Sequence, residues 1–375
     1  LVGSKYKTKN KLPILRTKNV RRSLALLSAK FHKLQPNIIA CVTGTNGKTS
    51  TCHFLREIWE NNGFLSASLG TLGLNSKNNE SFYQINKPFL TTLDPINLHK
   101  KLSHLKNAGI DRLAMEASSH GLKQHRLDGV KFSLACFTNL SHDHLDHHET
   151  FEDYKKQKFR LFDELILETG TAVINIDSEV GVQLKDILHN RNINVTTYGN
   201  DINADWYIKD IYQQNGNKVL ELILDNYKHI IPTGLNSSFQ IFNAIAAAAL
   251  ASASGIPEIN SIFSLRNLTN PEGRMQRIKS SDGFTIYIDY SHTPDSLKTI
   301  LKDKKSKEGK LILIIGCGGN RDKLKRPIIG KIASDYADFI YITDDNPRFE
   351  NPKNIRAEII SGMNKTVSFD EISNR

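Results

Sequence analysis

Cysteine is scarce in this sequence: only four occur among 375 residues, and no two of them form a Cys-x-x-Cys pair. A disulfide scaffold and a zinc ribbon both need more cysteines at closer spacing, so neither is expected, and a reducing compartment is favoured. Long apolar runs are also lacking, because none approaches the roughly 18 residues that a membrane span requires. These absences predict a soluble, cytoplasmic protein without a membrane partner.

Acidic residues are outnumbered by basic ones, 39 against 50, which gives a formal net charge of +11. Such a balance suits either a nucleic-acid partner or acidic small molecules. The basic residues are spread along the chain apart from clusters at 5–11 and 302–310, and no basic stripe interleaved with aromatic residues is present. We therefore favour a basic, solvated surface and expect no nucleic-acid partner.

Both ends of the sequence look cut. Leu1 is not an initiator methionine, and residues 366–371 run from an expected strand into a segment that stops at Arg375. We therefore expect a fragment of a longer protein.

The length predicts two or three domains at the usual size of roughly 100–200 residues each. From residue 37 onwards, short apolar runs typical of buried strands alternate with segments of helical periodicity. This alternation predicts an α/β fold with a mostly parallel sheet covered by helices. The expected strands are 38–42, 112–115, 134–137 and 172–175, and the expected helices are one that ends at Trp59, 97–108, and 236–254 with Asn236 as N-cap and Gly255 at its end.

The alternation restarts after the turn at residues 270–273, which marks a domain boundary. A second, Rossmann-type α/β unit is predicted there. Residues 1–36 are basic, contain one amphipathic helix at 20–31, and are too few for a domain. In the second unit the expected strands are 284–288, 311–315 and 339–343, and the expected helices begin at Pro294 and near 328 and 354.

A glycine-containing loop, Thr43-Gly-Thr-Asn-Gly-Lys-Thr49, joins the first expected strand to the first helix. Loops of this kind turn backbone N–H groups towards a phosphate, and the helix N-terminus adds positive potential. Lys48 would reach the β- and γ-phosphates, and the Thr49 hydroxyl would hold Mg²⁺. The predicted ATP-binding residues here are Gly44, Thr45, Asn46, Gly47, Lys48, Thr49 and Ser50.

The spacing of this loop is shorter than the general G-x-x-x-x-G-K-[ST] pattern. It resembles the ATP loop of the Mur ligases and of their folylpolyglutamate synthetase relatives, and further motifs follow in the family's order from Gly44 to Arg348. The resemblance implies a remnant of an N-terminal UDP-binding domain at 1–36, a central P-loop-type ATPase domain at 37–270, and an incomplete, Rossmann-like C-terminal amino-acid-binding domain at 271–375. We also expect a monomer.

Two polar segments follow expected strands and invite a metal. Glu116 ends one strand, where α/β proteins form their sites, and residues 142–148 contain four His and two Asp. A Zn²⁺ site, a purely structural loop and a Mg²⁺ site are all compatible with these residue types. The neighbouring phosphate loop favours Mg²⁺, held by oxygen ligands and one His.

The segment from Asp143 to His148, followed by Tyr154-Lys-Lys-Gln-Lys158, resembles the same stretch of the Mur ligases. The resemblance implies that Lys158 is carbamylated and that the modified side chain helps to hold Mg²⁺. A carbamate would supply the anionic oxygen that Mg²⁺ prefers. By residue type alone, Lys158 does not differ from Lys155 and Lys156, and a solvated helix face is the alternative. The implied metal ligands are Thr49, Glu116, His144 and carbamylated Lys158.

Other positions take a role only from the resemblance. Its UDP-muramoyl-peptide contacts fall on hydroxyl, amide and guanidinium side chains, which suit an anionic, sugar-bearing substrate. Its nucleotide contacts include an arginine that would supply charge to the γ-phosphate, so the implied catalytic residues are Lys48, Lys158 and Arg274. The substrate positions are Thr91, Thr92, Ser118, Gln124 and Arg126, and the further ATP positions are Asn243, Arg274, Asp289 and His292.

The segment Asp345-Asn346-Pro347-Arg348 follows the last expected strand of the second unit. It resembles the signature of Mur ligases that add meso-diaminopimelate to the UDP-MurNAc-dipeptide. Arg348 and Arg321 can pair with the extra carboxylate of that amino acid, whereas a lysine would present an ammonium group to them. A helix-entry turn with Asn-Pro is the structural alternative.

The resemblance implies an ADP-forming amide ligase that uses ATP and Mg²⁺ and proceeds through an acyl phosphate on the D-Glu carboxylate. L-Lysine, or a folate with glutamate, are alternative substrates of the same reaction type. A P-loop NTPase acting on nucleic acid is the alternative from another class, but it leaves residues 345–348 unexplained and predicts a steep salt dependence.

Overall fold

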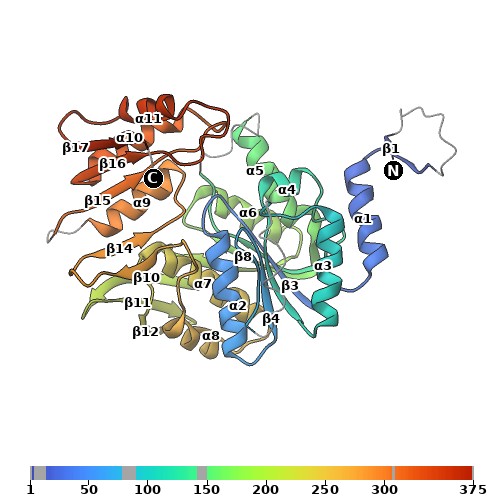
Figure 1. Ribbon diagram of the computed structural model, residues 1–375. Coiled ribbons are helices and arrows are strands. Elements are labelled where there is room, and N and C mark those ends of the chain that lie inside the picture. Colours follow the sequence, from blue (N-terminus) through green and yellow to red (C-terminus); the bar gives the residue numbers. More distant parts are fainter. Residues whose placement is uncertain (1, 4–13, 78–89, 142–149, 306–308, 374–375) are drawn as a thin grey trace. The chain divides into compact units, whose positions relative to one another are not determined.

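The computed structural model describes residues 2–3, 14–77, 90–141, 150–305 and 309–373 (Figure 1). The chain folds as two compact units, one made of residues 1–140 and 152–272 and the other of residues 141–151 and 273–375. Each unit has its own apolar core. None of the helices in the described ranges is long and apolar enough to cross a lipid bilayer.

A ten-stranded sheet lies at the centre of the described part of the first unit. Every pairing between its third and ninth strands is parallel, while a three-stranded antiparallel extension closes one side and a short antiparallel strand the other. In spatial order the strands are β12 (Tyr227–Thr233), β11 (Asn217–Leu224), β10 (Trp206–Gln214), β9 (Asn194–Gly199), β8 (Ile166–Asn175), β7 (Phe132–Phe137), β3 (Ile38–Thr43), β6 (Arg112–Glu116), β4 (Ser66–Gly70) and β5 (Gly73–Asn75).

Helices cover both faces of this sheet (Figure 1). Along β3, Ala40 and Val42 belong to one core and Ile39 and Cys41 to the other, because successive side chains of a strand point to opposite faces. A strand buried on both faces needs a continuous apolar run, which is what residues 38–42 provide. On the first face lie α2 (Lys48–Asn61), α7 (Ser238–Ala253) and α8 (Glu258–Ser264); on the second lie α3 (Pro95–Asn107) and α6 (Glu179–His189).

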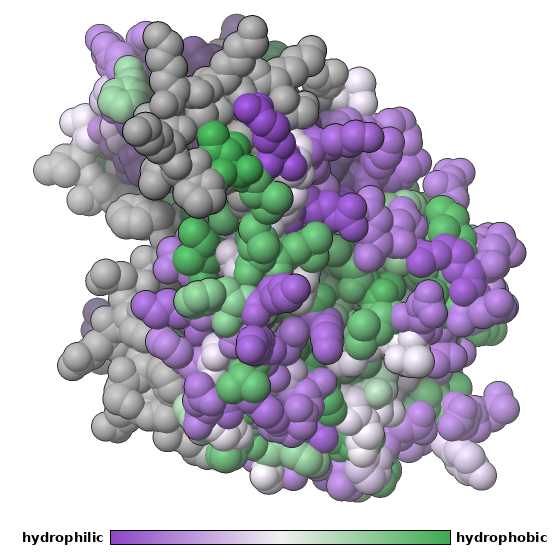
Figure 2. Space-filling view, turned by 90° about the vertical axis from the view of Figure 1, so that its right-hand side faces the viewer, coloured by the Kyte–Doolittle hydropathy of each residue, from purple (hydrophilic) through white to green (hydrophobic). Residues whose placement is uncertain are grey.

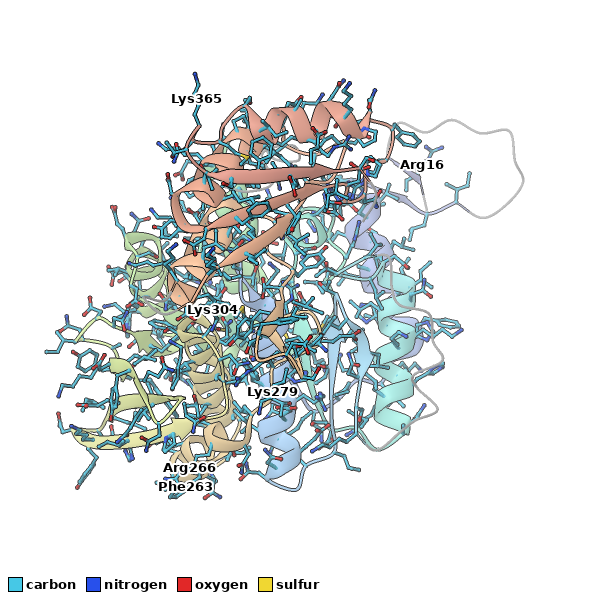
Figure 3. The ribbon with its side chains drawn as sticks, turned by 60° about the vertical axis from the view of Figure 1, so that its left-hand side comes forward. Arg16, Phe263, Arg266, Lys279, Lys304 and Lys365 are labelled. Atoms are coloured by element: carbon cyan, nitrogen blue, oxygen red, sulfur yellow. The ribbon has the colours of Figure 1, made fainter. Side chains whose placement is uncertain are left out.

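Short elements complete the first unit. They are β1 (Val2–Gly3), β2 (Arg16–Thr17), α1 (Val20–His32), α4 (Ser119–Lys123), α5 (Phe151–Arg160), the π-helical turn η2 (Leu161–Leu165) and the 3₁₀ turn η3 (Leu265–Asn267). Arg266 of η3 lies over the ring of Phe263, with 4.9 Å between the guanidinium carbon and the ring centroid (Figure 3).

Local signals explain where the helices begin. Asp94 accepts hydrogen bonds from the backbone N–H groups of Ile96 and Asn97 at the start of α3, and Pro95 occupies the first turn. Asn19 likewise accepts from the Arg22 backbone N–H at the start of α1, which packs against α3.

Figure 2 shows the side of the molecule that faces right in Figure 1, where hydrophilic and hydrophobic residues are interspersed.

The second unit contains a parallel sheet of three strands in the described residues, and a separate antiparallel hairpin. Lys304 lies over the ring of Tyr287, with 4.5 Å between Nζ and the ring centroid, so that a helix and the hairpin are in contact (Figure 3). The sheet strands are β15 (Ile312–Ile315), β16 (Phe339–Thr343) and β17 (Ser368–Ile372), the hairpin strands β13 (Gln276–Lys279) and β14 (Thr285–Ile288), and the helices α9 (Pro294–Lys304), α10 (Lys325–Tyr336) and α11 (Pro352–Ile360).

The predicted α/β class, with a mostly parallel sheet, is confirmed. One detail of the prediction is wrong, and one part of the sheet was not predicted. The N-cap of α7 is Ser237 rather than Asn236, although the helix does end directly before Gly255, whose φ is +95°. The antiparallel extension formed by β10, β11 and β12 was not predicted, although the Asn215-Gly216 turn that joins β10 to β11 is a sequence signal for a hairpin.

Candidate active site

Four neighbouring parallel strands of the first unit end at one edge of the sheet. In spatial order they are β7, β3, β6 and β4. Since parallel strands present their carboxyl ends at the same edge, the residues that follow them meet there. These are Thr138, the phosphate loop from Gly44, Glu116 as the last residue of β6, and Thr71.

Two glycines let neighbouring side chains approach the phosphate loop. A Cβ on Gly44 would lie 1.9 Å from Oγ1 of Thr138, and a Cβ on Gly47 would lie 2.3 Å from Oδ1 of Asn243. Both glycines also have positive φ angles, +152° and +88°, which disfavour other residues. The loop therefore needs glycine at both positions for space as well as for backbone conformation.

The end of β7 fixes the conformation of the loop. The backbone N–H of Thr45 donates to the Asn139 carbonyl oxygen and that of Asn46 to Asn139 Oδ1, both at 2.9 Å. The Thr138 hydroxyl donates to the Asn46 carbonyl oxygen at 2.6 Å. Neither Thr138 nor Asn139 was predicted to have a role, although their position directly after a buried strand is the signal that could have identified them.

Two lysines donate to the same loop. Lys48 Nζ donates to the carbonyl oxygens of Gly44 and Thr45, at 2.9 and 2.7 Å, and Lys158 Nζ donates to that of Gly44 at 2.6 Å. The side chain of Lys158 is buried, at 1% exposure, whereas Lys156 is exposed. A solvated helix face does not describe Lys158.

Tyr154 holds Lys158 and the loop together. Its ring centroid lies 4.6 Å from Lys158 Nζ, and its hydroxyl lies 3.1 Å from Oγ1 of Thr45. Tyr154 is fully buried. Lys158 lies four residues after Tyr154 in α5 and therefore on the same helix face, which brings its amino group next to the Tyr154 ring.

Glu116 is a buried carboxylate, 2% exposed, at the end of β6. Its Oε1 accepts from the Thr49 hydroxyl at 3.0 Å and from the backbone N–H of Thr71 at 2.7 Å, and its Oε2 accepts from the Thr71 hydroxyl at 3.2 Å. The predicted ligand His144 lies outside the described residues. Among those that are described, no group of three or more His, Cys, Asp or Glu side chains could hold a metal ion.

The positions that the resemblance assigned to the muramoyl-peptide lie next to Glu116. The Thr92 hydroxyl donates to the Glu116 carbonyl oxygen and lies 3.1 Å from the Ser118 hydroxyl. Arg126 donates to the Thr92 carbonyl oxygen at 2.8 Å and, through two nitrogens, to Gln124 Oε1. Thr91 Oγ1 lies 3.2 Å from Thr71 Oγ1. The structure thus brings all five of these residues together around one strand end.

Asn243 and Ser50 belong to the buried side of the loop. Asn243 is 8% exposed, donates to Gln240 Oε1 at 2.9 Å and faces Gly47. Ser50 lies in the first turn of α2 and is also buried. A lone asparagine in a helix is more often exposed, but Asn243 is buried because glycine at position 47 leaves the space that its side chain fills.

In the second unit, the remaining predicted nucleotide contacts gather around Tyr290. The Arg274 guanidinium carbon lies 4.5 Å from the Tyr290 ring centroid, and His292 Nδ1 lies 3.1 Å from the Tyr290 carbonyl oxygen. Asp289 accepts from the Met275 backbone N–H at 2.8 Å and from the Ser291 hydroxyl at 2.6 Å. Tyr290, which contacts both Arg274 and His292, was not among the predicted nucleotide contacts.

The predicted amino-acid site forms a glycine-lined turn of the second unit. Arg348 Nη1 donates to the Gly319 carbonyl oxygen at 2.6 Å, and the Gly319 N–H donates to that of Asn346 at 2.8 Å. A Cβ on Gly319 would lie 1.8 Å from the carbonyl oxygen of Pro347, so the two segments touch through their backbones. Arg348 itself is exposed, as are Arg321, Asp345 and Asn346.

A carboxylate that the prediction missed secures this turn. Glu350 accepts hydrogen bonds from the buried guanidinium of Arg326 at 3.0 and 3.1 Å and from the Asn320 backbone N–H, and it pairs with Lys323. The Arg326 contact first, and the Asn320 N–H next, lower the pKa of Glu350 to about 2. The carboxylate therefore ties the glycine turn to α10 and to the segment that carries Arg348.

Comparison with known families identifies the two units. Residues 42–251 match the Mur ligase middle domain, and residues 273–374 match the Mur ligase glutamate ligase domain. The first match covers more than half of the chain. This chain belongs to the Mur ligase family.

Curated relatives extend this similarity over nearly the whole of this Mur ligase. The UDP-N-acetylmuramoyl-L-alanyl-D-glutamate--2,6-diaminopimelate ligase of Bradyrhizobium diazoefficiens is 39% identical over 373 residues, which are 96% of this chain and 74% of the relative. The ligase of the same name from Rickettsia conorii is 40% identical over 369 residues, again 96% of this chain and 75% of the relative. A solved structure of a ligase of that name has a TM-score of 0.69 at 31% identity, and the match covers 96% of this chain and 74% of that one.

Proposed function

We propose that this Mur ligase joins meso-diaminopimelate to UDP-N-acetylmuramoyl-L-alanyl-D-glutamate with cleavage of ATP to ADP and inorganic phosphate. The observation that carries the proposal is the identity of 39% and 40%, across 96% of the chain, to ligases named for that reaction. The first unit offers a phosphate loop beside a buried carboxylate, and the second offers an arginine-bearing turn, which are the features that such a reaction needs.

The phosphate loop is proposed to bind ATP. Its glycines permit close approach, and Lys48 already lies over the loop carbonyl oxygens, from which a phosphate would draw it. We assign Asn243 to the nucleotide as well, because its side chain lies against the loop. The proposed ATP contacts are Gly44, Thr45, Asn46, Gly47, Lys48, Thr49, Ser50, Asn243, Arg274, Asp289 and His292.

The donor set beside the loop fits Mg²⁺. That ion prefers oxygen ligands and needs few from the protein when phosphates supply others. The Thr49 hydroxyl and the Glu116 carboxylate lie 3.0 Å apart and are buried. We assign them to the ion together with His144 and with Lys158 as its carbamate, and the bound ion would neutralise charge on the phosphate oxygens.

The proposed reaction has two steps. An oxygen of the D-Glu carboxylate attacks the γ-phosphorus, the bond to the β-phosphate oxygen breaks, and ADP leaves an acyl phosphate behind. The amine of diaminopimelate then attacks the acyl carbon, loses a proton and expels inorganic phosphate. Lys48 and Arg274 would stabilise the negative charge of the transferring phosphoryl group, so the chain acts through positioning and electrostatics.

The acceptor is proposed to bind at the glycine turn of the second unit. Arg348 and Arg321 are exposed there and can pair with the carboxylate at the far end of diaminopimelate, with Asp345, Asn346 and Pro347 shaping the turn. L-Lysine is the alternative acceptor, which would place an ammonium group beside these guanidinium groups. For the donor we assign Thr91, Thr92, Ser118, Gln124 and Arg126, which form one hydrogen-bonded cluster beside Glu116.

We also infer the organisation of the enzyme. Within this chain, we assign residues 1–36 to a UDP-binding domain, residues 37–270 to an ATPase domain and residues 271–375 to an amino-acid-binding domain. We expect it to act as a monomer in the cytoplasm, where ATP is available, with no nucleic acid and no membrane as partner.

ADP release by the full-length gene product tests the proposal. With UDP-MurNAc-dipeptide, ATP and Mg²⁺ present, release is expected when meso-diaminopimelate is added and not when a polynucleotide is added instead. Release that depends on L-lysine would retain the ligase and replace the acceptor. Release driven by polynucleotide, or none with any amino acid, would contradict the proposal.

A further inference from the structure

Glu116 lies against a strand end that offers it space and two hydrogen-bond donors. A Cβ on Gly70, the last residue of β4, would lie 2.0 Å from Glu116 Oε1, 2.5 Å from Cδ and 2.6 Å from Cγ. No side chain larger than hydrogen leaves room for this carboxylate. Gly70 is therefore required for the space it leaves and not for a positive φ angle, which the structure does not record at this residue.

Thr71 contacts both oxygens of the same carboxylate. Its backbone N–H donates to Oε1 at 2.7 Å and its hydroxyl lies 3.2 Å from Oε2. A carboxylate that is 2% exposed has little water to solvate it, so these hydrogen bonds fix its orientation. The Thr49 hydroxyl donates a further hydrogen bond to Oε1, at 3.0 Å.

We propose that Gly70 and Thr71 position Glu116 to hold the metal ion. The proposal rests on the proposed function, in which Glu116 and Thr49 bind Mg²⁺, and it adds two residues that neither the motif nor the resemblance assigned. Thr71 is a positioning residue: it acts through Glu116. Since Thr71 Oγ1 also lies 3.2 Å from Thr91 Oγ1, the same residue joins the metal carboxylate to the proposed donor-substrate cluster.

The substitution Thr71→Val tests the hydroxyl separately from the backbone. Valine keeps the shape and the backbone N–H but leaves Oε2 without this donor. Loss of a group that orients a metal ligand typically weakens metal affinity by roughly 10- to 100-fold. We expect the Mg²⁺ concentration at half-maximal enhancement of ADP binding to rise by that factor, while ADP affinity in EDTA stays unchanged. Thr71→Ser is expected to restore the Mg²⁺ dependence.

The measurement is calorimetric titration of the full-length protein with ADP at a series of Mg²⁺ concentrations. The matched control is Thr51→Val, which removes another buried threonine hydroxyl of the same unit, one without a hydrogen-bond partner in the described part of the chain. A merely structural role would lower the thermal midpoint of Thr71→Val and leave its Mg²⁺ midpoint where wild type has it. That outcome would overturn the proposal.

The substitution Gly70→Ala tests, in the same titration, whether the Glu116 carboxylate needs the space that glycine leaves at position 70. We expect its Mg²⁺ dependence to be weakened at least as much as that of Thr71→Val, because the methyl group displaces the carboxylate itself. Gly234→Ala is the control, since a Cβ there would meet its nearest neighbour at an ordinary 3.5 Å. A normal Mg²⁺ midpoint in Gly70→Ala would contradict the inference. Absence of Mg²⁺-dependent ADP binding in wild type would instead overturn the proposed metal site as a whole, and this inference with it.

Discussion

Lys48 and Lys158 donate hydrogen bonds to one acceptor, the carbonyl oxygen of Gly44, at 2.9 and 2.6 Å. Lys48 reaches it from the first turn of α2 and Lys158 from the last part of α5. The amino groups of two lysines, both unmodified in this structure, thus converge at the start of the phosphate loop. The conformation of the loop therefore depends on both lysines.

Lys158→Arg keeps the positive charge but cannot form a carbamate. If the modified side chain holds Mg²⁺, ADP release should fall by roughly 100-fold or more, as it does when one electrostatic contact to the reacting groups is removed. In addition, ¹³C-labelled bicarbonate should give a protein-bound carbamate NMR signal in wild type and none in this variant. The control is Lys156→Arg, at an exposed lysine of the same helix. A carbamate signal that persists in Lys158→Arg would show that another lysine is modified.

Arg348→Ala removes the guanidinium proposed to bind the far carboxylate of the acceptor. A hydrogen bond to a charged group contributes about 1.5–3 kcal/mol, which corresponds to roughly a 10- to 100-fold rise in KM for diaminopimelate. KM for ATP should stay unchanged. Arg348→Lys should have a KM for diaminopimelate between those of wild type and Arg348→Ala, because lysine keeps the charge but lacks the planar guanidinium that binds a carboxylate through two hydrogen bonds. Arg277→Ala, at an exposed arginine of β13, serves as the control. Equal rises in both KM values would point to a distorted domain and against a specific acceptor contact.

Glu350 makes the second unit sensitive to acid. Its pKa is lowered from 4.5 to about 2 by its contacts with Arg326 and the Asn320 N–H. A carboxylate with a lowered pKa stabilises the fold fully above 4.5, and this contribution is lost as the pH falls towards 2. The protection factors of the α10 amides against hydrogen exchange, which are corrected for the intrinsic exchange rate at each pH, should therefore fall between pH 4.5 and 2.

Glu350→Gln is expected to weaken protection of α10 already at pH 6 and to flatten this acid dependence. Asp370→Asn, at an exposed acid of β17, provides the comparison and should leave the dependence intact. If Glu350→Gln shows the same acid-induced loss of protection as wild type, the contacts of Glu350 are not its cause.

Asn139→Ala removes two side-chain hydrogen bonds to the phosphate loop, one from the Asn46 N–H and one to the Asn46 carbonyl oxygen. At about 1 kcal/mol for each, a looser loop should weaken ADP binding by roughly tenfold or more. Calorimetry of ADP binding in EDTA measures this effect without the metal. Asn190→Ala, at the exposed end of α6, should bind ADP as wild type does. Wild-type affinity in Asn139→Ala would mean that Thr138 and the glycines suffice to shape the loop.

The sequence predicts the first unit well where an apolar run directly precedes a polar motif. Gly44–Thr49 follows a strand that is buried on both faces, and Glu116 is the last residue of another, so their places at the sheet edge follow from alternation of strand and helix alone. Asn139 carries the same signal, because it follows the buried strand β7, whereas Thr71 follows β4, a strand that was not predicted. Their partners depend on the lateral strand order β7-β3-β6-β4, which alternation along the chain does not determine.

Burial separates residues that composition leaves equivalent. Lys155, Lys156 and Lys158 lie within four positions, yet only the last of these three is buried, because it faces the sheet side of α5 above Tyr154. Glu350 was missed for a similar reason, since its partner Arg326 lies on α10 and a lone acidic residue in a loop carries no signal of an ion pair. His144 lies outside the described residues, so its role stays a prediction.

The central claim is the identity of the acceptor, and a competition experiment tests it most directly. The full-length protein would receive UDP-MurNAc-dipeptide, ATP, Mg²⁺ and equal concentrations of meso-diaminopimelate and L-lysine, and the nucleotide-linked products would be weighed by mass spectrometry. We predict a product that carries diaminopimelate and none that carries lysine. A predominant lysine product would contradict the role given to Arg348 and the acceptor assigned to this Mur ligase.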